Sequence, residues 1–307
     1  MSLSVIFLGT AASIPTPQRS LPAIAIQRKG ELILFDCGEG TQRQMIRAGV
    51  GFHRKTKVFI THMHGDHVLG LPGLLQTMSL LDRERKLEIY GPPKIKAFVE
   101  AMSQTVQFKL TFPLETFKIE EAGLVCEDRE YAVHAAWADH DIPSLAYALV
   151  EKPRPGKFYP DKAKDLGVPE GPLWSRLQQG LQVKLPNGRI VKPQDVMGSL
   201  RPGRKIVYTG DTRPSTSLVQ LAANADLLIH DSTFDDELAE KAHEDGHSTA
   251  SQAAQTAKKA KVKRLILAHI SARYREPDLL REQAKKIFPH VDTAEDFMRI
   301  DLPLLDI

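Results

Sequence analysis

One short stretch of the sequence decides the fold: residues 61–67 read Thr-His-Met-His-Gly-Asp-His. Four potential metal ligands lie within six residues, directly after the apolar run 58–60. Imidazole nitrogens suit zinc, and a carboxylate adds a hard oxygen ligand whose charge offsets that of the cation. Gly65 gives the backbone freedom where the side chains must turn toward a common point. The stretch therefore predicts a metal site at the end of a buried strand.

Further ligands must come from distant parts of the chain, because one zinc needs about four ligands and two zincs need more. His140, Asp211 and His269 are the candidates, since each follows a strand-like run as His62 does. Taken singly, each has an ordinary interpretation as a loop histidine, a helix cap or a hydrogen-bonding residue at a strand end. Together with the cluster at 61–67 they complete a metal-binding set.

The order of elements indicates a mixed α/β protein built in layers. Short apolar runs with polar ends predict strands, and helical periodicity marks residues 93–105 and 248–261. The second of these helices begins on Ser248 and Thr249, which are good N-cap residues. Open sheets place their ligands at strand ends, where the polar residues lie. The expected strands are 5–8, 23–27, 31–35, 58–61, 205–209, 226–229 and 264–268.

The composition fits a soluble protein with a large core. The 307 residues are 42% hydrophobic and 26% charged, which argues against disorder. The net charge of +3 makes no global case for nucleic acid. Two cysteines exclude a disulfide scaffold and fit a reducing compartment. No apolar run approaches the length that spans a membrane, so we expect a cytoplasmic protein with no membrane partner.

Residues 151–200 interrupt this pattern. They contain seven of the 20 prolines, six of the 20 glycines, and nine basic against five acidic side chains. The segment thus carries +4, and the rest of the chain sums to −1. Such a stretch is either a disordered linker or a functional arm. Because neither flank shows a second core of its own, we expect an insertion within one domain that spans 1–307.

The whole chain resembles the ribonuclease Z family of tRNA 3′-processing endonucleases, within the metallo-β-lactamase superfamily. The likeness rests on the cluster at 61–67 and on further motifs in the family's order. These are FLGT at 7–10, FDCGEGTQ at 35–42, GLPGL at 70–74, YTGDT at 208–212 and AHISARY at 268–274. The resemblance implies a four-layer αβ/βα sandwich, in which two similar halves bring their strand ends together over two metal ions.

The resemblance also implies roles for individual residues. Two zinc ions, or manganese or another divalent ion in their place, would be held by seven side chains with a water between them. One ion is assigned to His62, His64 and His140, the second to Asp66, His67 and His269, and Asp211 bridges the two. Asp66 would also orient the water and take its proton. His247 matches the histidine of the family's His-Ser-Thr motif and would protonate the leaving oxygen.

Further matches concern the substrate. Arg273 follows the ligand His269 and is a suitable phosphate-binding fork. Arg19 lies in the segment 15–20, which resembles the family's Pro-x-Lys-x-Arg-Asn loop but has Ser in place of Asn and no matching Lys. Gly171 and Pro172 resemble the tip of the flexible arm by which these enzymes grip the tRNA elbow. The resemblance thus implies precursor tRNA as substrate and a homodimer as the assembly.

Three functions follow from these residues. The first is a zinc-dependent endoribonuclease that removes the 3′ trailer from precursor tRNA and leaves a 3′-hydroxyl. The second is another hydrolase on the same scaffold, such as a general phosphodiesterase or a glyoxalase II-like thioesterase, because the ligand set is shared. The third is a non-catalytic RNA-binding protein, which a complete ligand set argues against. The basic arm and the motif at 268–274 favour the first.

Overall fold

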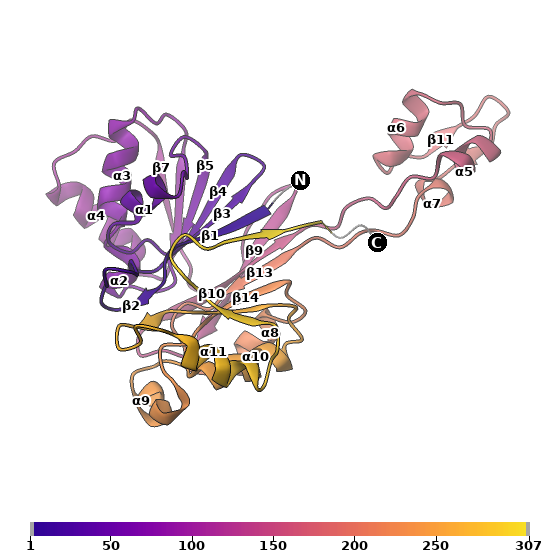
Figure 1. The fold of residues 1–307 in the computed structure, drawn as a ribbon. Coiled ribbons are helices and arrows are strands. Elements are labelled where there is room, and N and C mark those ends of the chain that lie inside the picture. Colours follow the sequence, from indigo (N-terminus) through magenta and orange to yellow (C-terminus); the bar gives the residue numbers. More distant parts are fainter. Residues whose placement is uncertain (1–2, 305–307) are drawn as a thin grey trace. The chain divides into compact units, whose positions relative to one another are not determined.

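Two seven-stranded sheets form the centre of the fold (Figure 1). The structure is a computed structural model that describes residues 3–304. In spatial order, the first sheet contains β18 (Arg299–Leu302), β1 (Leu3–Gly9), β3 (Ala23–Arg28), β4 (Glu31–Phe35), β5 (Lys55–Phe59), β6 (Leu87–Gly91) and β7 (Leu114–Lys118). The second contains β17 (Val291–Thr293), β15 (Leu265–Ala268), β14 (Leu227–Asp231), β13 (Lys205–Tyr208), β10 (Ser144–Glu151), β9 (Tyr131–Ala138) and β8 (Gly123–Glu127).

Helices cover the outer face of each sheet, as Figure 1 shows. The first sheet carries α1 (Thr41–Arg47), α2 (Gly65–Val68), α3 (Leu71–Leu80) and α4 (Ile95–Thr105). The second carries α8 (Thr216–Leu221), α10 (Ala250–Lys259) and α11 (Asp278–Lys285), while the 3-10 turn η1 (Asp236–Leu238) and α9 (Ala239–Glu244) lie in the connection from β14 to α10. A short parallel pair, β2 (Ala11–Ala12) with β16 (Ile270–Ser271), joins the first half of the chain to the last.

Three apolar cores explain why these layers stack. The central core takes inward side chains from both sheets, among them Phe35 and Tyr147, whose rings stack with centroids 5.7 Å apart. A second core lies between the first sheet and α1, α3 and α4. A third lies between the second sheet and α8, α10 and α11, and it is rich in alanine. The helix–sheet–sheet–helix order confirms the predicted four-layer sandwich.

The sequence-based elements agree with the structure to within a few residues. All seven expected strands are present, as are the helices expected at 93–105 and 248–261, observed as α4 and α10. Thr249 is the N-cap of α10, and it forms a capping box with Gln252. Parallel pairing joins β4 to β5, β13 to β14, and β14 to β15, so the carboxyl ends of these strands gather at a common edge of each sheet. Among residues 3–304, the structure has no helix long and apolar enough to cross a membrane.

Arg83 is a buried cation that ties together loops at the edge of the first sheet. Its side chain is fully buried, and its guanidinium donates to the backbone oxygens of Phe52, Arg54 and Lys86. Burial lowers the pKa of Arg83 to about 10.

Replacing Arg83 with alanine is expected to lower the free energy of unfolding by about 2 kcal/mol, because buried carbonyls lose their donors and a cavity remains. Urea denaturation measures the change, with the exposed neighbour Arg85→Ala as control. A loss within about 0.5 kcal/mol, as for ordinary surface changes, would contradict the structural role.

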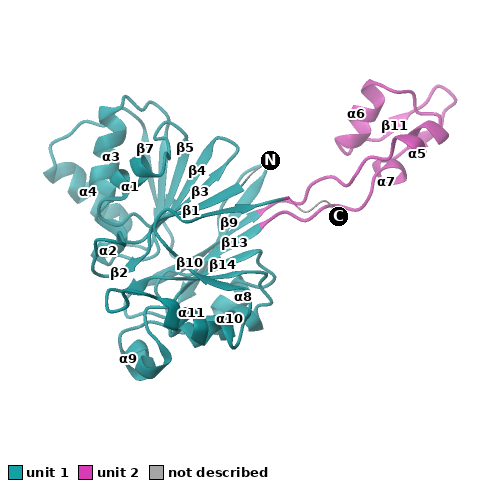
Figure 2. Ribbon diagram, in the orientation of Figure 1, with its two compact units in different colours: residues 1–150, 205–303 teal, residues 151–204, 304–307 magenta. Residues whose placement is uncertain are grey.

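Residues 151–204 form a compact unit of their own, shown in magenta in Figure 2. We call this unit the arm. The sequence indicated no periodic segment here, yet the arm has a small core. Its helices have four to seven residues and its strands two, so no element is long enough to show a period. Its elements are α5 (Pro160–Asp165), α6 (Pro172–Gln178), β11 (Val183–Lys184), β12 (Ile190–Val191) and α7 (Pro193–Val196). Its core residues are Ala163, Val168, Leu177, Val183, Leu185, Val191 and Val196.

The two ends of the arm are bonded to each other. The Arg204 guanidinium donates to both carboxylate oxygens of Glu151, at 2.6 and 2.8 Å, with both side chains buried. Three residues further along each segment, Arg154 and Arg201 exchange backbone hydrogen bonds of 2.8 and 2.9 Å. Such a bidentate pair is among the stronger side-chain contacts. The arm therefore begins and ends in a defined stem.

Candidate active site

The stretch at 61–67 leaves β5 and turns into α2 (Gly65–Val68). The rings of His62 and His67 are fully buried, whereas His64 is exposed and Asp66 is partly buried. Burial, reinforced by the positive charge of His67, holds the pKa of His62 well below its usual value. Burial and His140 likewise lower the pKa of His64. Neutral imidazoles offer lone pairs, so these rings are prepared to bind a cation.

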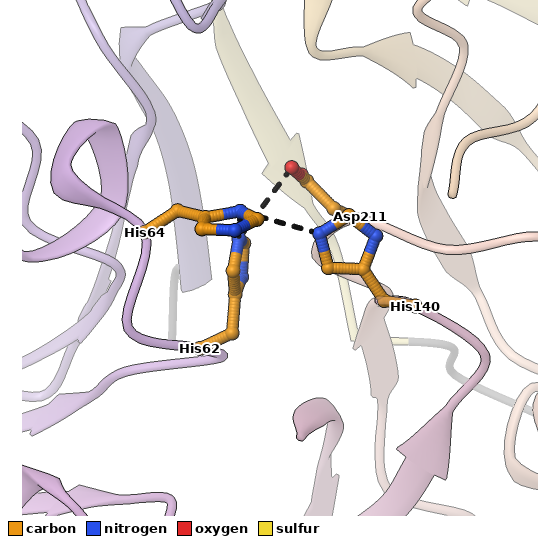
Figure 3. Close-up of side chains that lie close together, drawn as sticks. All are labelled: His62, His64, His140 and Asp211. Carbon is orange, nitrogen blue, oxygen red and sulfur yellow. Dashed lines mark hydrogen bonds and ion pairs between the residues drawn. The ribbon is translucent and has the colours of Figure 1, made fainter. Parts of the chain in front are cut away.

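His140 and Asp211 arrive from the second sheet and face this pair (Figure 3). The donor atoms of His62, His64, His140 and Asp211 all lie within 4.8 Å of one another. His64 Nδ1 is 3.1 Å from His62 Nε2 and 3.3 Å from His140 Nε2, and His62 Nε2 is 3.6 Å from Asp211 Oδ2. Donors on one tetrahedral zinc, each about 2.0–2.2 Å from the ion, lie about 3.3–3.6 Å apart. The spacing therefore suits one small cation.

A second group of donors lies beside the first. The donor atoms of Asp66, His67 and His269 lie within 4.8 Å of one another. His269 Nε2 is 3.4 Å from His67 Nε2 and 3.5 Å from Asp66 Oδ2. Asp211 reaches this group too, at 3.3 Å from both rings. The structure thus brings together the seven side chains that the sequence nominated, with Asp211 between the two groups.

The burial and charge of the two carboxylates in the donor set suit a pair of cations. Asp211 is almost fully buried, and within the described residues 3–304 its Oδ1 atom accepts no hydrogen bond of regular geometry, although His67 Nε2 lies 3.3 Å away. Burying a carboxylate oxygen without a good hydrogen-bond donor costs free energy, and a bound cation would offset this cost. Burial alone would raise the pKa of Asp66, but a hydrogen bond from His269 and the charge of His67 hold it below its usual range. Both carboxylates are therefore available as anionic ligands.

Asp36 supports the site from the central core. Its carboxylate accepts hydrogen bonds from His67 Nδ1 at 2.7 Å, from Tyr208 Oη at 2.8 Å and from the Thr61 backbone at 2.7 Å. A carboxylate on the far nitrogen fixes the ring orientation and leaves Nε2 for the metal. Asp36 belongs to the motif at 35–42, from which no role was predicted for it, although its place directly after β4 was a signal.

Asp231 also lies at the site, although no role was predicted for it from the sequence. It ends β14, is 1% exposed, and accepts a 2.9 Å hydrogen bond from His247 Nδ1. Thr233 Oγ1 donates to Asp231 Oδ1 at 2.7 Å and lies 2.8 Å from His269 Nδ1. Burial favours the neutral ring of His247, but the charge of Asp231 outweighs it and raises the His247 pKa to about 9. The pair thus places a readily protonated ring beside the donor side chains, 5.2 Å from the ring of His269.

The sequence and the fold are similar to those of known proteins. The chain is 47% identical over 302 residues to ribonuclease Z of Methanosarcina acetivorans, covering 98% of each chain. The chain belongs to the ribonuclease Z family. Ribonuclease Z of Myxococcus xanthus is 46% identical, covering 99% of each chain. The crystal structure of the short form of human tRNase Z aligns with a TM-score of 0.71 at 33% identity, covering 98% of this chain and 99% of the other.

Family descriptions agree with the fold. Residues 181–270 match the beta-lactamase superfamily domain, and residues 3–107 match the family described as anti-Pycsar protein Apyc1. Membership of the ribonuclease Z family and the superfamily sandwich, both expected from the sequence, are therefore confirmed. The assignment of single residues to roles stays a prediction.

Arg273 lies near the His247 side of the site. Its guanidinium sits over the ring of Phe234, 4.9 Å from the centroid, and Phe234 meets His247 edge-on at 6.0 Å. Its Nε donates to Ser271 Oγ at 3.1 Å. The side chain is otherwise open to solvent, so a phosphate contact, expected for the ribonuclease Z family, is compatible with its position.

Arg19 lies inside the protein. The residue is 8% exposed, and its guanidinium donates to Thr10 Oγ1 and to the backbone oxygen of Ala294, both at 2.6 Å. The loop that Arg19 anchors does reach the site, because the backbone N–H of Ser13 donates to Asp66 Oδ2 at 2.9 Å. Substrate contact by Arg19 stays a prediction, and these bonds indicate that it would act through the loop.

Gly171 and Pro172 begin α6 within the arm and are exposed. Gly171 has a φ of 125°, a conformation that favours glycine. Trp174, in the next turn, packs against Phe158 and donates to the backbone oxygen of Val168 at 3.1 Å. Trp174 therefore stabilises the arm's own core, while the expected role of the exposed Gly171 and Pro172 stays a prediction.

Proposed function

We propose that this chain is a metal-dependent endoribonuclease that removes the 3′ trailer of precursor tRNA and leaves a tRNA 3′-hydroxyl. One observation carries the proposal: seven donor side chains and the His247–Asp231 pair converge between the two sheets. The chain is also a full-length relative of ribonuclease Z, with 47% identity to that of Methanosarcina acetivorans.

Two zinc ions are the cofactors that the donor set suits, with manganese or another divalent ion as the alternative. When bound, two such ions lower the pKa of a water and stabilise charge on both the attacking and the leaving oxygen. We assign His62, His64 and His140 to one ion. Asp66, His67 and His269 belong to the other, and Asp211 is shared.

Asp66 is proposed to orient the attacking water and to take its proton. The Ser13 N–H holds its Oδ2, so the carboxylate cannot rotate freely. The pKa of Asp66 is held low, so the side chain is an anion at neutral pH. A fixed anion beside the reacting water is the geometry that a general base requires.

His247 is proposed to give a proton to the leaving ribose oxygen. Its Nδ1 proton is donated to Asp231, which fixes the ring and leaves Nε2 to carry the transferred proton. A poor leaving group such as a ribose 3′-oxygen needs this proton, whereas a nitrophenolate leaves without it.

Changing Asp231 to asparagine should lower the rate of precursor cleavage by about 10- to 100-fold, because the amide supports the charged ring less well. Hydrolysis of a nitrophenyl phosphodiester should fall by less than about threefold. The ratio of the two rates is the measurement, with zinc content checked in each preparation. Equal losses on both substrates would contradict the proton-donor role of the pair.

Substrate binding is proposed to involve Arg273, the loop anchored by Arg19, and the arm. The arm's excess positive charge suits the phosphates of tRNA without reading bases. Gly171 and Pro172 stand at the proposed point of contact. We also propose action in the cytoplasm, which fits two free cysteines.

A homodimer is the proposed assembly. Ile46 on α1, Leu69 after α2 and Leu80 on α3 are 63%, 54% and 76% exposed, and large aliphatic side chains on neighbouring helices suit a second copy. Sedimentation equilibrium at micromolar concentration should give twice the chain mass. The variant Leu80→Asp should shift this equilibrium toward monomer, while Leu124→Asp, with a 57% exposed residue on β8, should not. A monomeric wild type would exclude the proposed dimer.

Incubation with a 3′-extended tRNA precursor tests the main proposal. Mapping of the new ends should give one cut at the tRNA 3′ end and a 3′-hydroxyl, and chelation should abolish it. Whether the cut precedes or follows an encoded CCA is read from the same map. Cleavage of a thioester or a simple phosphodiester with no cleavage of the precursor would favour another hydrolase on this scaffold. Precursor binding without any cleavage would favour a non-catalytic RNA-binding protein.

A further inference from the structure

Arg213 lies two residues after the shared ligand Asp211, in the loop that follows β13. Its guanidinium extends toward a second loop, where Nη2 donates to Asp141 Oδ1 at 2.7 Å and Nη1 to Asp139 Oδ1 at 3.4 Å. The backbone N–H of Arg213 also donates to the backbone oxygen of Asp139 at 2.7 Å. The metal-binding residue His140 lies between these two aspartates. Arg213 therefore contacts the residues on both sides of that ligand.

A third loop meets the same guanidinium. Nε donates to the backbone oxygen of His243 at 2.5 Å, and Nη2 donates to that of Glu244 at 3.2 Å. This segment ends α9 and leads within three residues to His247. The Arg213 side chain is only 15% exposed, although its two aspartate partners are 55% and 51% exposed. One planar group thus bonds the loops of a ligand and of the proton donor.

Those two loops also touch directly. His140 Nδ1 donates to the backbone oxygen of Gly246 at 2.8 Å, which leaves Nε2 for the cation. Gly246 has a φ of 80°, and a side chain there would come within 2.5 Å of His140 Nδ1. The rings of His140 and His247 lie 5.4 Å apart. The position of His140 is therefore set by the 243–246 segment, which Arg213 holds.

We propose that Arg213 is a positioning residue that fixes His140 and His247 relative to each other. The inference rests on the proposed function for the role of His247, but not for the metal-binding role of His140. Five donors in a rigid fork can bond two neighbouring loops at once, which a lysine ammonium on a flexible stem does less well. Partners of this kind behind a metal ligand typically change metal affinity or activity by about 10- to 100-fold.

Zinc titration of the metal-free full-length chain, in competition with a fluorescent zinc chelator, tests the proposal without relying on activity. Arg213→Ala should weaken one of the two bound ions by about 10- to 100-fold and leave the other within about threefold, because His140 serves one ion only. Arg213→Lys should show most of this loss. The control Arg264→Ala, which removes an exposed pair with Asp292, should change neither affinity.

Kinetics give the second measurement. At saturating zinc, Arg213→Ala should lower kcat on precursor tRNA by about 10- to 100-fold, with KM changed less than about threefold, because the arm is untouched. If Arg213→Ala fails to fold, Asp141→Ala removes the shortest carboxylate contact and should give the same one-ion loss in smaller measure. Unchanged zinc affinities, or equal weakening of both ions with a lowered Tm, would overturn the proposal. If the wild-type chain does not cleave precursor tRNA but Arg213→Ala still weakens the binding of one ion, the proposed function is refuted and the positioning of His140 is supported.

Discussion

Replacing Asp66 by alanine is expected to lower cleavage of precursor tRNA by at least about a thousandfold, or about 4 kcal/mol of transition-state stabilisation. The side chain belongs to one group of metal donors, 3.5 Å from both His67 Nε2 and His269 Nε2. It is also the proposed base, so one substitution removes a ligand and a proton acceptor together. Single-turnover rates with the enzyme in excess measure the chemical step.

Asp66→Asn separates the two roles of this residue. The amide oxygen can still face a cation, but it cannot take a proton, so zinc content should stay closer to wild type while the rate remains low. Asp278→Ala, which removes an exposed carboxylate paired with Arg281, is the matched control and should cleave normally. Asp66→Ala with both ions bound and most of its rate retained would show that another group is the base.

Replacing residues 155–200 by a short Gly/Ser linker is expected to lower kcat/KM for precursor tRNA by at least about a hundredfold. The replacement removes the arm's whole core and keeps the stem, in which Arg204 is bonded to Glu151. Charge-assisted hydrogen bonds contribute about 1.5–3 kcal/mol each, so losing two phosphate contacts accounts for an effect of this size. Hydrolysis of a nitrophenyl phosphodiester should stay within about tenfold.

Salt dependence identifies the cause of this loss. Each missing phosphate contact should reduce the slope of log K against log salt by roughly 0.7–0.9. A milder variant neutralises the exposed Lys184, Arg189 and Lys192 to alanine and should flatten the slope without removing the arm's fold. Its control neutralises three exposed lysines near the end of α10, Lys258, Lys259 and Lys261. Equal losses on both substrates, or unchanged cleavage of tRNA, would contradict a substrate-binding arm.

The cluster of donor side chains was predictable because four of its members are close together in sequence. Residues 61–67 supply four donors after one strand, and a strand also precedes each of the distant donors Asp211 and His269. Asp36 and Asp231 also follow or end a strand, yet the sequence offers no sign of which imidazole each one meets. Their partners, His67 and His247, lie 31 and 16 residues away along the chain. Only packing of the layers decides such pairs.

Two other features, the burial of Arg19 and the core of the arm, could not be predicted from the sequence. Arginine is usually exposed. The buried Arg19 is stabilised by hydrogen bonds to Thr10 and to the backbone of Ala294, which is 275 residues away. The arm's core consists of isolated apolar residues among prolines and glycines, so no window shows a period. In both cases the stabilising contact comes from a residue that no local sequence pattern can identify.

The contacts of Asp36 have a consequence for the order in which the protein matures. Its carboxylate accepts from His67 of the first half of the chain and from Tyr208 of the second. The carboxylate therefore has both of these partners only after the two halves have packed against each other. A nascent chain with only its first half made lacks Asp211 and His269, so it is a poor chelator. Cations would accordingly bind last and stabilise the finished fold by mass action, rather than nucleate it.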